Sequence, residues 1–329
     1  SRSGPRGRRT ARARRPDRPL TMLVRPALIP FWQCVPGFER ILAFEIGWGG
    51  TLRTWRRVVA GRFDAAVIQP HSFRSAWLPF AAGIPVRVGP PGHLRDFLLT
   101  HRMPMRLAPG RRHQAWETAD GLGLELDRLP PPPWLEPPLA GGMDRLRSVG
   151  LDPDRDRLAV LFPGAARGPA KRWPASHFAA VGARLAGERG YRVILAGTGA
   201  DRPACEETLQ AMEGRAVNLA GCTGMIELAA ILKRCMLVVA NDSGGMHLAT
   251  AVNTPVIGIF GLTDPERTGP LGAFSRVVSP PGVRGSRDIP RDSTEARRRL
   301  AEIDPDRVWR EVEALESAAT ARRAGETGP

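Results

Sequence analysis

The fold is decided by one run of ten residues, Val238-Val239-Ala240-Asn241-Asp242-Ser243-Gly244-Gly245-Met246-His247. It predicts a buried strand, a polar turn and the start of a helix. The first amides of a helix have no partner inside it, and the helix dipole gives them partial positive charge. Because Gly244 and Gly245 lack side chains, a diphosphate can come close to the backbone there. Two other interpretations remain open: Asn241 or Asp242 caps the helix, and His247 is a packed histidine.

A second run follows an earlier expected strand and consists of Phe162-Pro163-Gly164-Ala165-Ala166-Arg167-Gly168-Pro169-Ala170-Lys171-Arg172-Trp173-Pro174. Ligands of open parallel sheets bind beyond the carboxyl ends of the strands, so we expect both runs at one edge. Lys171 is one of only two lysines in a chain whose usual cation is arginine. A compact ammonium suits a phosphate, and the alternative is a solvated loop lysine. Trp173 is expected to pack the loop rather than stack on a base.

Other loops on this edge give weaker signals. The loop Gly197–Asp201 is rich in glycine, but it is not the Gly-x-Gly-x-x-Gly pattern of dinucleotide sites. Thr223 precedes the next expected helix on the same edge. In the first half of the chain, His71, Ser72 and Arg74 follow a strand in the same way and are expected to face a cleft. The alternative role of Ser72 is a helix cap.

Outside these runs, short apolar segments alternate with helical ones, which is typical of parallel βαβ units. In the second half we expect strands at 158–162, 192–196, 217–219, 237–240 and 255–260, and helices at 174–189, 203–212, 225–234 and 243–252. In the first half we expect strands at 20–24, 41–44 and 65–68 and a helix at 72–82. Prolines crowd residues 128–138, which predicts a semi-rigid spacer between two α/β domains.

Composition narrows the class of protein. The 329 residues are 42% hydrophobic and carry a formal charge of +15, and no window is long and apolar enough for a transmembrane helix. Residues 1–18 hold eight arginines against one aspartate, so they contribute +7 and leave +8 for the rest. That excess suits anionic substrates beside an anionic membrane better than nucleic acid, which we do not expect as a partner. The Arg-rich start lacks an apolar region typical of a secretory signal. The four cysteines fit no zinc spacing and predict reduced, partly buried thiols in a cytosolic protein.

At this point the sequence resembles a known family. The runs 163–174 and 241–247 are similar to those of the heptosyltransferase II group of glycosyltransferase family 9, as are the segments Pro70–Ala76 and Pro79–Pro85. The resemblance covers roughly residues 12–315. It implies an α/β protein of the GT-B fold, in which two Rossmann-like parallel-sheet domains face each other across a cleft.

The resemblance also implies a division of labour along the chain. Residues 1–15 are expected to be disordered, 16–128 to form an N-terminal acceptor-binding domain, and 129–139 to be a Pro-rich linker. Residues 140–303 would then form the nucleotide-sugar-binding domain, and the helix 304–319 would cross back to the first domain.

The implied reaction is an inverting transfer of heptose from ADP-heptose to the inner core of lipopolysaccharide, with neither metal nor cofactor. By this resemblance Lys171 and the amides of Ser243 and Gly244 hold the diphosphate, and Asp242 holds sugar hydroxyls. His247 would lie near the phosphates and Thr223 near the nucleoside. The implied acceptor, lipid A bearing the core, would lie near Ser72 and Arg74. The enzyme would work in the cytoplasm, in peripheral contact with the cytoplasmic face of the inner membrane.

The sequence departs from the family at its start. Members begin with a buried strand and a Gly-Asp loop whose aspartate is the expected general base. Here residues 11–17 resemble the end of the first helix and 20–24 the second strand, so the first strand is expected to be missing. We therefore assign no catalytic residue and expect slow transfer by these 329 residues. Two alternatives remain: a family 9 transferase of another sugar, and an inactive nucleotide-sugar-binding remnant.

Overall fold

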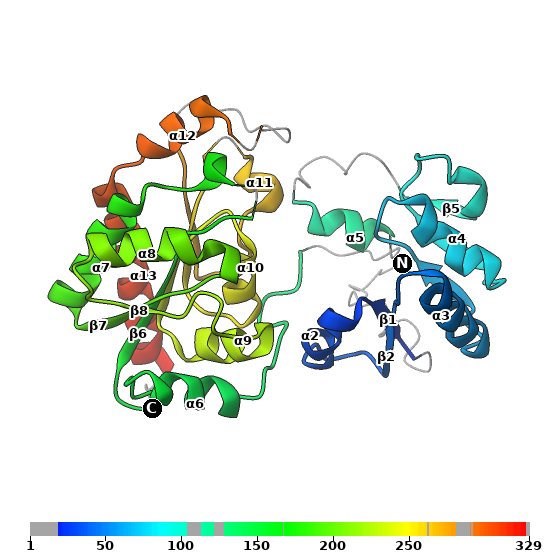
Figure 1. The fold of residues 1–329 in the computed structure, drawn as a ribbon, viewed down its shortest axis with the longest axis horizontal. Helices are drawn as coiled ribbons and strands as arrows, with labels where there is room; N and C mark the ends of the chain where they lie inside the picture. The colour runs from blue at the N-terminus through cyan, green and yellow to red at the C-terminus, as the bar shows by residue number, and fades with distance from the viewer. Residues whose placement is uncertain are drawn as a thin grey trace, which may run out of the picture. The chain divides into compact units, whose positions relative to one another are not determined.

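The computed structural model describes residues 19–103, 113–121, 128–166, 168–261, 263–280, 290 and 292–326. The chain divides between Pro130 and Pro131 into two compact units, which we call unit 1 (residues 1–130) and unit 2 (residues 131–329). Figure 1 draws each unit as parallel strands flanked by helices. None of the described helices is long and apolar enough to cross a membrane.

Unit 2 is built on one parallel sheet of six strands. The strands are β6 (Arg157–Phe162), β7 (Tyr191–Leu195), β8 (Val217–Asn218), β9 (Leu237–Asn241), β10 (Val256–Ile259) and β11 (Ser275–Val278). Their order in the sheet is β11-β10-β9-β6-β7-β8, so the first strand of the unit lies in the middle. All five strands expected in this half are confirmed within two residues, and β11 was missed because it is short and only partly apolar.

Helices connect and cover these strands. They are α6 (Ala140–Ser148), α7 (Ala175–Arg189), α8 (Arg202–Ala211), α9 (Met225–Arg234), α10 (Gly244–Ala251), α11 (Pro265–Thr268), α12 (Thr294–Ala301) and α13 (Pro305–Glu326), with short 3-10 turns η3 (Pro169–Lys171) and η4 (Gly199–Asp201). The four helices expected between 174 and 252 are confirmed. The sequence analysis missed α6, which packs on α9. A Cβ at Gly142 would lie 2.7 Å from the Cβ of Ala230, so this glycine permits the close approach of the two helices.

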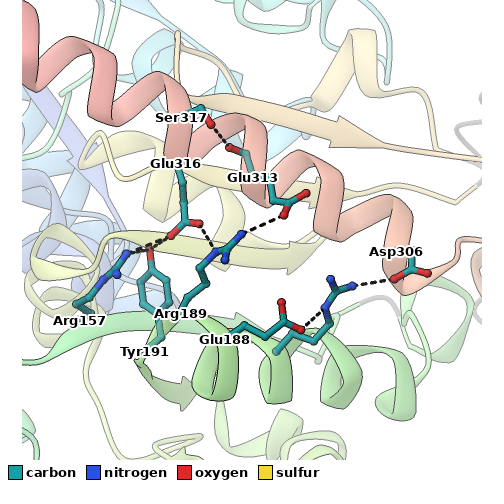
Figure 2. A network of polar contacts seen from close by, with 9 residues as sticks. Arg157, Glu188, Arg189, Tyr191, Asp306, Glu313, Glu316 and Ser317 are labelled. Carbon is teal, nitrogen blue, oxygen red and sulfur yellow. Dashed lines mark hydrogen bonds and ion pairs between the residues drawn. The ribbon is translucent and has the colours of Figure 1, made fainter.

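The last helix, α13, packs on unit 2 through apolar and charged contacts. Trp309, Val312 and Leu315 are buried in the main core cluster of the unit. Figure 2 shows the polar part: Glu316 accepts hydrogen bonds from the Tyr191 hydroxyl at 2.8 Å and, through its other oxygen, from Arg189 Nε at 3.1 Å. These contacts join α13 to β7 and α7. The expectation that this helix crosses back to the first domain stays a prediction.

Burial affects the pKa of the tyrosine in this network. Tyr191 is buried and its hydroxyl donates to Glu316, and these two effects, in that order, raise the pKa of Tyr191 to about 12. Arg157 opposes the shift, since its guanidinium lies over the Tyr191 ring and donates to both Tyr191 and Glu316. The result is a neutral tyrosine within a cluster of charges.

Unit 1 contains two separate parallel sheets among its described residues. Strands β1 (Thr21–Val24) and β2 (Arg40–Ala43) form one, and β3 (Ala65–Val67), β4 (Val86–Gly89) and β5 (His101–Arg102) form the other. The helical segments are η1 (Pro26–Leu28), α2 (Ile29–Gln33), α3 (Trp48–Ala60), α4 (Phe73–Ala81), η2 (Asp96–Leu98) and α5 (Ala115–Gly121). The three expected strands and the expected helix 72–82 are confirmed. The sequence analysis missed α3, whose polar and glycine-rich start hides its apolar side, and the short strands β4 and β5.

The two small sheets of unit 1 share one apolar layer. Leu23 of β1 and Ala66 of β3 both pack against the cluster of Val58, Leu78 and Ile84. Within the part of the chain that the structure describes, β1 pairs only with β2, and β3 pairs only with β4. Among the described residues, the pairs β2-β1 and β3-β4-β5 correspond to β8-β7 and β9-β10-β11 of unit 2, and none of these described strands corresponds to β6. Residues 1–15, expected to be disordered, and the expected helix end at 11–17 lie outside the described residues.

The segment expected to be a semi-rigid, Pro-rich spacer is partly packed on unit 2. The amides of Trp134 and Leu135 both donate to the carbonyl of Ala251, at 2.8 and 3.1 Å, and Leu135 is fully buried. Its partner carbonyl belongs to α10, so this stretch is part of unit 2. Proline prevents helix and central strand here, as expected, but an apolar side chain between the prolines still finds a place in the core.

Candidate donor and acceptor sites

Three neighbouring strands of unit 2 end beside one another, and their loops form the candidate donor site. Phe162 at the end of β6 pairs with Ala240 of β9, and Asn241 of β9 pairs with Ile259 of β10. The loops after β6, β9 and β10 therefore leave the sheet at adjacent points. This confirms that the two runs singled out in the sequence open onto the same edge.

The Asn241 side chain, at the end of β9, forms hydrogen bonds with the loop after β6. It is fully buried, and its Oδ1 accepts a hydrogen bond from the Trp173 amide at 3.0 Å. Its Nδ2 donates to the carbonyls of Pro163 and Gly164, at 2.9 and 3.3 Å. Neither Asn241 nor Asp242 caps α10, so the capping interpretation was wrong: the cap residue is Ser243, without a side-chain bond. Asn241 instead fixes the loop after β6, a role that no local pattern revealed.

Lys171 and Asp242 form the central contact of the site. Lys171 Nζ lies 2.5 Å from Asp242 Oδ2, and the two side chains are only 14% and 10% exposed. Thr263, in the loop after β10, donates a second hydrogen bond to the same carboxylate oxygen at 2.9 Å. The alternative of a solvated loop lysine was therefore wrong. A charge pair this shielded needs both partners, because removal of one leaves the other poorly solvated.

Trp173 packs the loop, as expected. It is buried, and its indole Nε1 donates to the Ile303 carbonyl at 2.9 Å.

The start of α10 is open next to this ion pair. The Ser243 hydroxyl is buried and has no hydrogen-bond partner among the described residues. A Cβ at Gly244 would meet nothing within 4 Å, whereas a Cβ at Gly245 would lie 2.6 Å from the Phe162 ring. The lack of a side chain therefore has a different effect at each glycine. Gly244 leaves the helix amides open, and Gly245 allows α10 to pack on β6. The expectation that both glycines let a diphosphate approach the backbone stays a prediction, and the packing of Gly245 on Phe162 is an additional reason for that glycine.

Thr223 and His247 are the remaining expected donor-site residues. His247 is exposed, one turn into α10, with its amide 3.5 Å from the Ser243 carbonyl. Thr223 is in the loop after β8, which β6 and β7 separate from β9 in the sheet. That loop lies against the loop after β7, since the Gly221 amide donates to the Gly197 carbonyl at 3.0 Å. The structure therefore brings together Lys171, Asp242 and the Ser243 end of α10, with Thr223 farther along the same edge.

In unit 1, the candidate acceptor loop precedes α4. Ser72 is the cap residue of α4, and its hydroxyl accepts a hydrogen bond from the Ser75 amide at 3.3 Å, so the capping alternative is the observed one. Arg74 is exposed, lies over the Phe44 ring and donates to the Thr51 hydroxyl at 2.7 Å. Its guanidinium is thereby held at the first turn of α3, beyond the end of β2.

Arg95 shapes this loop and was missed in the sequence analysis. It is fully buried, and its guanidinium donates to the carbonyls of Pro90 and Ser72, at 2.9 and 3.2 Å, and also to that of Pro70. Burial lowers the pKa of Arg95 from its ordinary value, and the nearby Asp96 opposes this shift. One cation thus fixes the backbone around Ser72. Nothing in its sequence neighbourhood distinguishes it from the other arginines.

The described residues contain no group of three or more His, Cys, Asp or Glu side chains that could hold a metal ion. The cation beside the open helix start is Lys171. Parallel βαβ units with a helix terminus, a lysine and a carboxylate at the carboxyl edge form a site suited to the phosphates of a nucleotide.

Comparison with known proteins gives the family. The pattern of glycosyltransferase family 9 (heptosyltransferase) matches residues 51–287, and the chain belongs to this family. It is 31% identical to lipopolysaccharide heptosyltransferase 2 of Escherichia coli over 93% of this chain and 92% of that protein. It is 32% identical to lipooligosaccharide heptosyltransferase 2 of Haemophilus influenzae, over 76% of each chain.

Solved structures agree with the fold. The structure of ADP-heptose LPS heptosyltransferase II from E. coli superposes with a TM-score of 0.75 at 29% identity, covering 93% of this chain and 91% of that one. The E. coli heptosyltransferase WaaC with ADP superposes with a TM-score of 0.69 at 20% identity, covering 93% and 92%, and shows the fold alone. The protein is thus a GT-B glycosyltransferase of family 9, as the resemblance in its sequence indicated.

Proposed function

We propose that this protein transfers heptose from ADP-heptose to the inner core of lipopolysaccharide, with inversion and without a metal ion. The observation that carries the proposal is the Lys171–Asp242 pair beside the open start of α10. A relative with 31% identity is named for this activity, and a solved structure with 29% identity is named for its ADP-heptose donor.

Residues 140–303 bind the donor. The diphosphate takes the amides of Ser243 and Gly244, and Lys171 turns from Asp242 to a phosphate oxygen. Asp242, freed from the lysine, accepts hydrogen bonds from sugar hydroxyls. Positive charge from the helix dipole and from the ammonium stabilises the charge that develops on the leaving diphosphate, which is the work a metal ion does in other transferases. His247 lies near the phosphates and Thr223 near the nucleoside.

Residues 16–128 bind the acceptor. Arg74 pairs with a phosphate of the inner core, since a guanidinium matches phosphate oxygens in a bidentate way, and Ser72 contacts a neighbouring hydroxyl. The acceptor hydroxyl must give its proton to a general base during the transfer, and we assign that role to none of the described residues. Because the acceptor is lipid A bearing the core, the protein works at the cytoplasmic face of the inner membrane, in peripheral contact with it.

Two measurements test the proposal. Calorimetry with ADP, ADP-ribose and UDP should show binding of the two adenine nucleotides and weaker or absent binding of UDP. Equal binding of all three, or none, would overturn the donor assignment. The reaction is tested by measuring ADP release from ADP-heptose, which should depend on a core acceptor. If ADP were released from another ADP-sugar and not from ADP-heptose, a different donor would be favoured.

A further inference from the structure

The exposed apolar side chains of this protein are concentrated in unit 1. Of the fifteen large apolar side chains that are exposed among the described residues, twelve belong to unit 1 and three to unit 2. Scattered exposed apolar residues are normal on any protein, but a concentration on one part of the surface marks a contact with another body.

Five of these side chains belong to α4 and the segment around η2, and we call them the α4–η2 face. They are Phe73, Trp77, Phe80, Leu94 and Phe97, all at least 40% exposed. The first three are spaced by four and three residues on α4, which places them on one side of the helix. The Phe73 and Phe97 rings are 6.2 Å apart, so α4 and η2 contribute to one continuous surface.

Leu94 is the most exposed of these five side chains. Gly92, His93 and Leu94 are three consecutive residues in the left-handed region, with φ of 98°, 52° and 55°. Leucine rarely adopts this conformation, and here the strained backbone leaves the Leu94 side chain 88% exposed. The folded protein gains no burial from that side chain in return. The Gly92 amide donates to Asp96 and the Gly92 carbonyl accepts from the Arg95 amide, so hydrogen bonds of the turn itself hold Leu94 towards the solvent.

The charges around the α4–η2 face are mainly positive. Residues 73–103, which include α4, β4, η2 and β5, contain four arginines, of which Arg95 is buried, against a single acidic residue, Asp96. Arg87 lies over the Phe80 ring, 5.3 Å from its centroid. Asp96, the acidic residue within this segment, accepts a hydrogen bond from the Gly92 amide and lies 3.9 Å from Arg102 Nε. Its negative charge is therefore partly compensated by its neighbours.

We infer that the α4–η2 face inserts into the interfacial region of a bilayer that contains anionic lipids. Tryptophan and phenylalanine favour this region, and arginines add attraction to anionic headgroups. Phe73 stands between Ser72 and Arg74 in the chain, so insertion would bring the proposed acceptor loop to the membrane that holds the lipid acceptor. The inference deepens the proposed function by naming the surface that reaches the acceptor.

Flotation of the full chain with vesicles tests the inference. The wild type should float with vesicles of phosphatidylethanolamine and phosphatidylglycerol, less with phosphatidylcholine alone, and less at high salt. The double variant Leu94→Asp/Phe97→Asp should lower the partition coefficient by about tenfold or more, because the burial of one apolar side chain already contributes that much. Both side chains are exposed and aspartate tolerates the left-handed region, so the variant should fold. Each single variant, Leu94→Asp and Phe97→Asp, should also float less than the matched control Leu139→Asp, which makes the same change at an exposed apolar residue of unit 2 and should float as the wild type does.

A conservative change, Phe97→Trp, should retain flotation. The inference is overturned if the wild type does not float with anionic vesicles, or if Leu94→Asp/Phe97→Asp floats as well as Leu139→Asp. A concentration-dependent dimer that the double variant loses would overturn it as well, because the face would then be a contact between copies of the chain. ADP affinity should be equal in all variants, so a loss of flotation with normal ADP binding separates this inference from the proposed donor site.

Discussion

Lys171→Ala is expected to destabilise the free protein as well as to weaken ADP binding. The substitution leaves Asp242, 10% exposed, with Thr263 as its remaining hydrogen-bond donor. Loss of one partner of a fully buried pair costs about 3–5 kcal/mol, and partial exposure with one remaining donor reduces this to about 1–3 kcal/mol. In a unit of this size, about 2 kcal/mol corresponds to a fall in Tm of about 4–8 °C.

The chain contains a matched control for this prediction. Its other lysine, Lys233, is also ion-paired, with Glu136, but the two side chains are 32% and 54% exposed. An exposed pair contributes about 0–1 kcal/mol, so Lys233→Ala should hardly change the Tm. Scanning calorimetry of the wild type and both variants, at one pH and salt concentration, measures the difference.

ADP affinity tests the same pair in a second way, because substitution of Lys171 should weaken ADP binding and substitution of Asp242 should not. Lys171→Ala should weaken ADP binding by about 1.5–3 kcal/mol, or roughly 10- to 150-fold, as the loss of a charged hydrogen bond. Asp242→Asn frees Lys171 and removes a negative charge from the start of α10, so it should bind ADP as tightly as the wild type or more tightly. Titration calorimetry measures both. The reasoning is refuted if Lys171→Ala matches Lys233→Ala in both Tm and affinity, or if Asp242→Asn loses affinity as Lys171→Ala does.

Three further predictions follow from the described contacts. Gly245→Ala should lower stability by about 1–3 kcal/mol through overpacking, whereas Gly244→Ala should keep the Tm and weaken ADP binding; thermal melts and calorimetry decide between them. Arg95→Lys should keep fewer of the carbonyl contacts, so backbone amides near the acceptor loop should exchange faster with solvent while ADP affinity stays unchanged; equal exchange would contradict this. Because the pKa of Tyr191 is raised to about 12, its protonated form favours the folded state, and stability should fall as the pH rises from about 10 to about 12. The chain has one tyrosine, so tyrosinate absorbance reports it directly, and Glu316→Gln should lower this pKa; an unchanged titration would show that Glu316 has no part in it.

The sequence by itself determined most of the local architecture of unit 2, and three strands and one helix of unit 1. Between residues 158 and 260, segments with the apolar pattern of a strand alternate with segments with that of a helix. This alternation predicted five strands and four helices that the structure confirms. Such patterns are local, because each residue's exposure follows from the repeat of its own strand or helix. Because the loops at 163–174 and 241–247 each follow an expected parallel strand, the sequence also predicted that they lie on one edge of the sheet. The sequence analysis missed α3 and α6, whose first turns each contain two glycines, and the short strands β4, β5 and β11.

Only the tertiary structure decided which residues meet. The pairing of Lys171 with Asp242 depends on β6 lying beside β9, and strand order cannot be read from periodicity. The role of Asn241 depends on that order as well, as does the need for a glycine at 245, where the Phe162 ring of the neighbouring strand leaves no room. Arg95 acts on a loop more than twenty residues earlier in the chain. In each case the partner is distant in sequence, and contacts of that kind arise only when separate elements pack together.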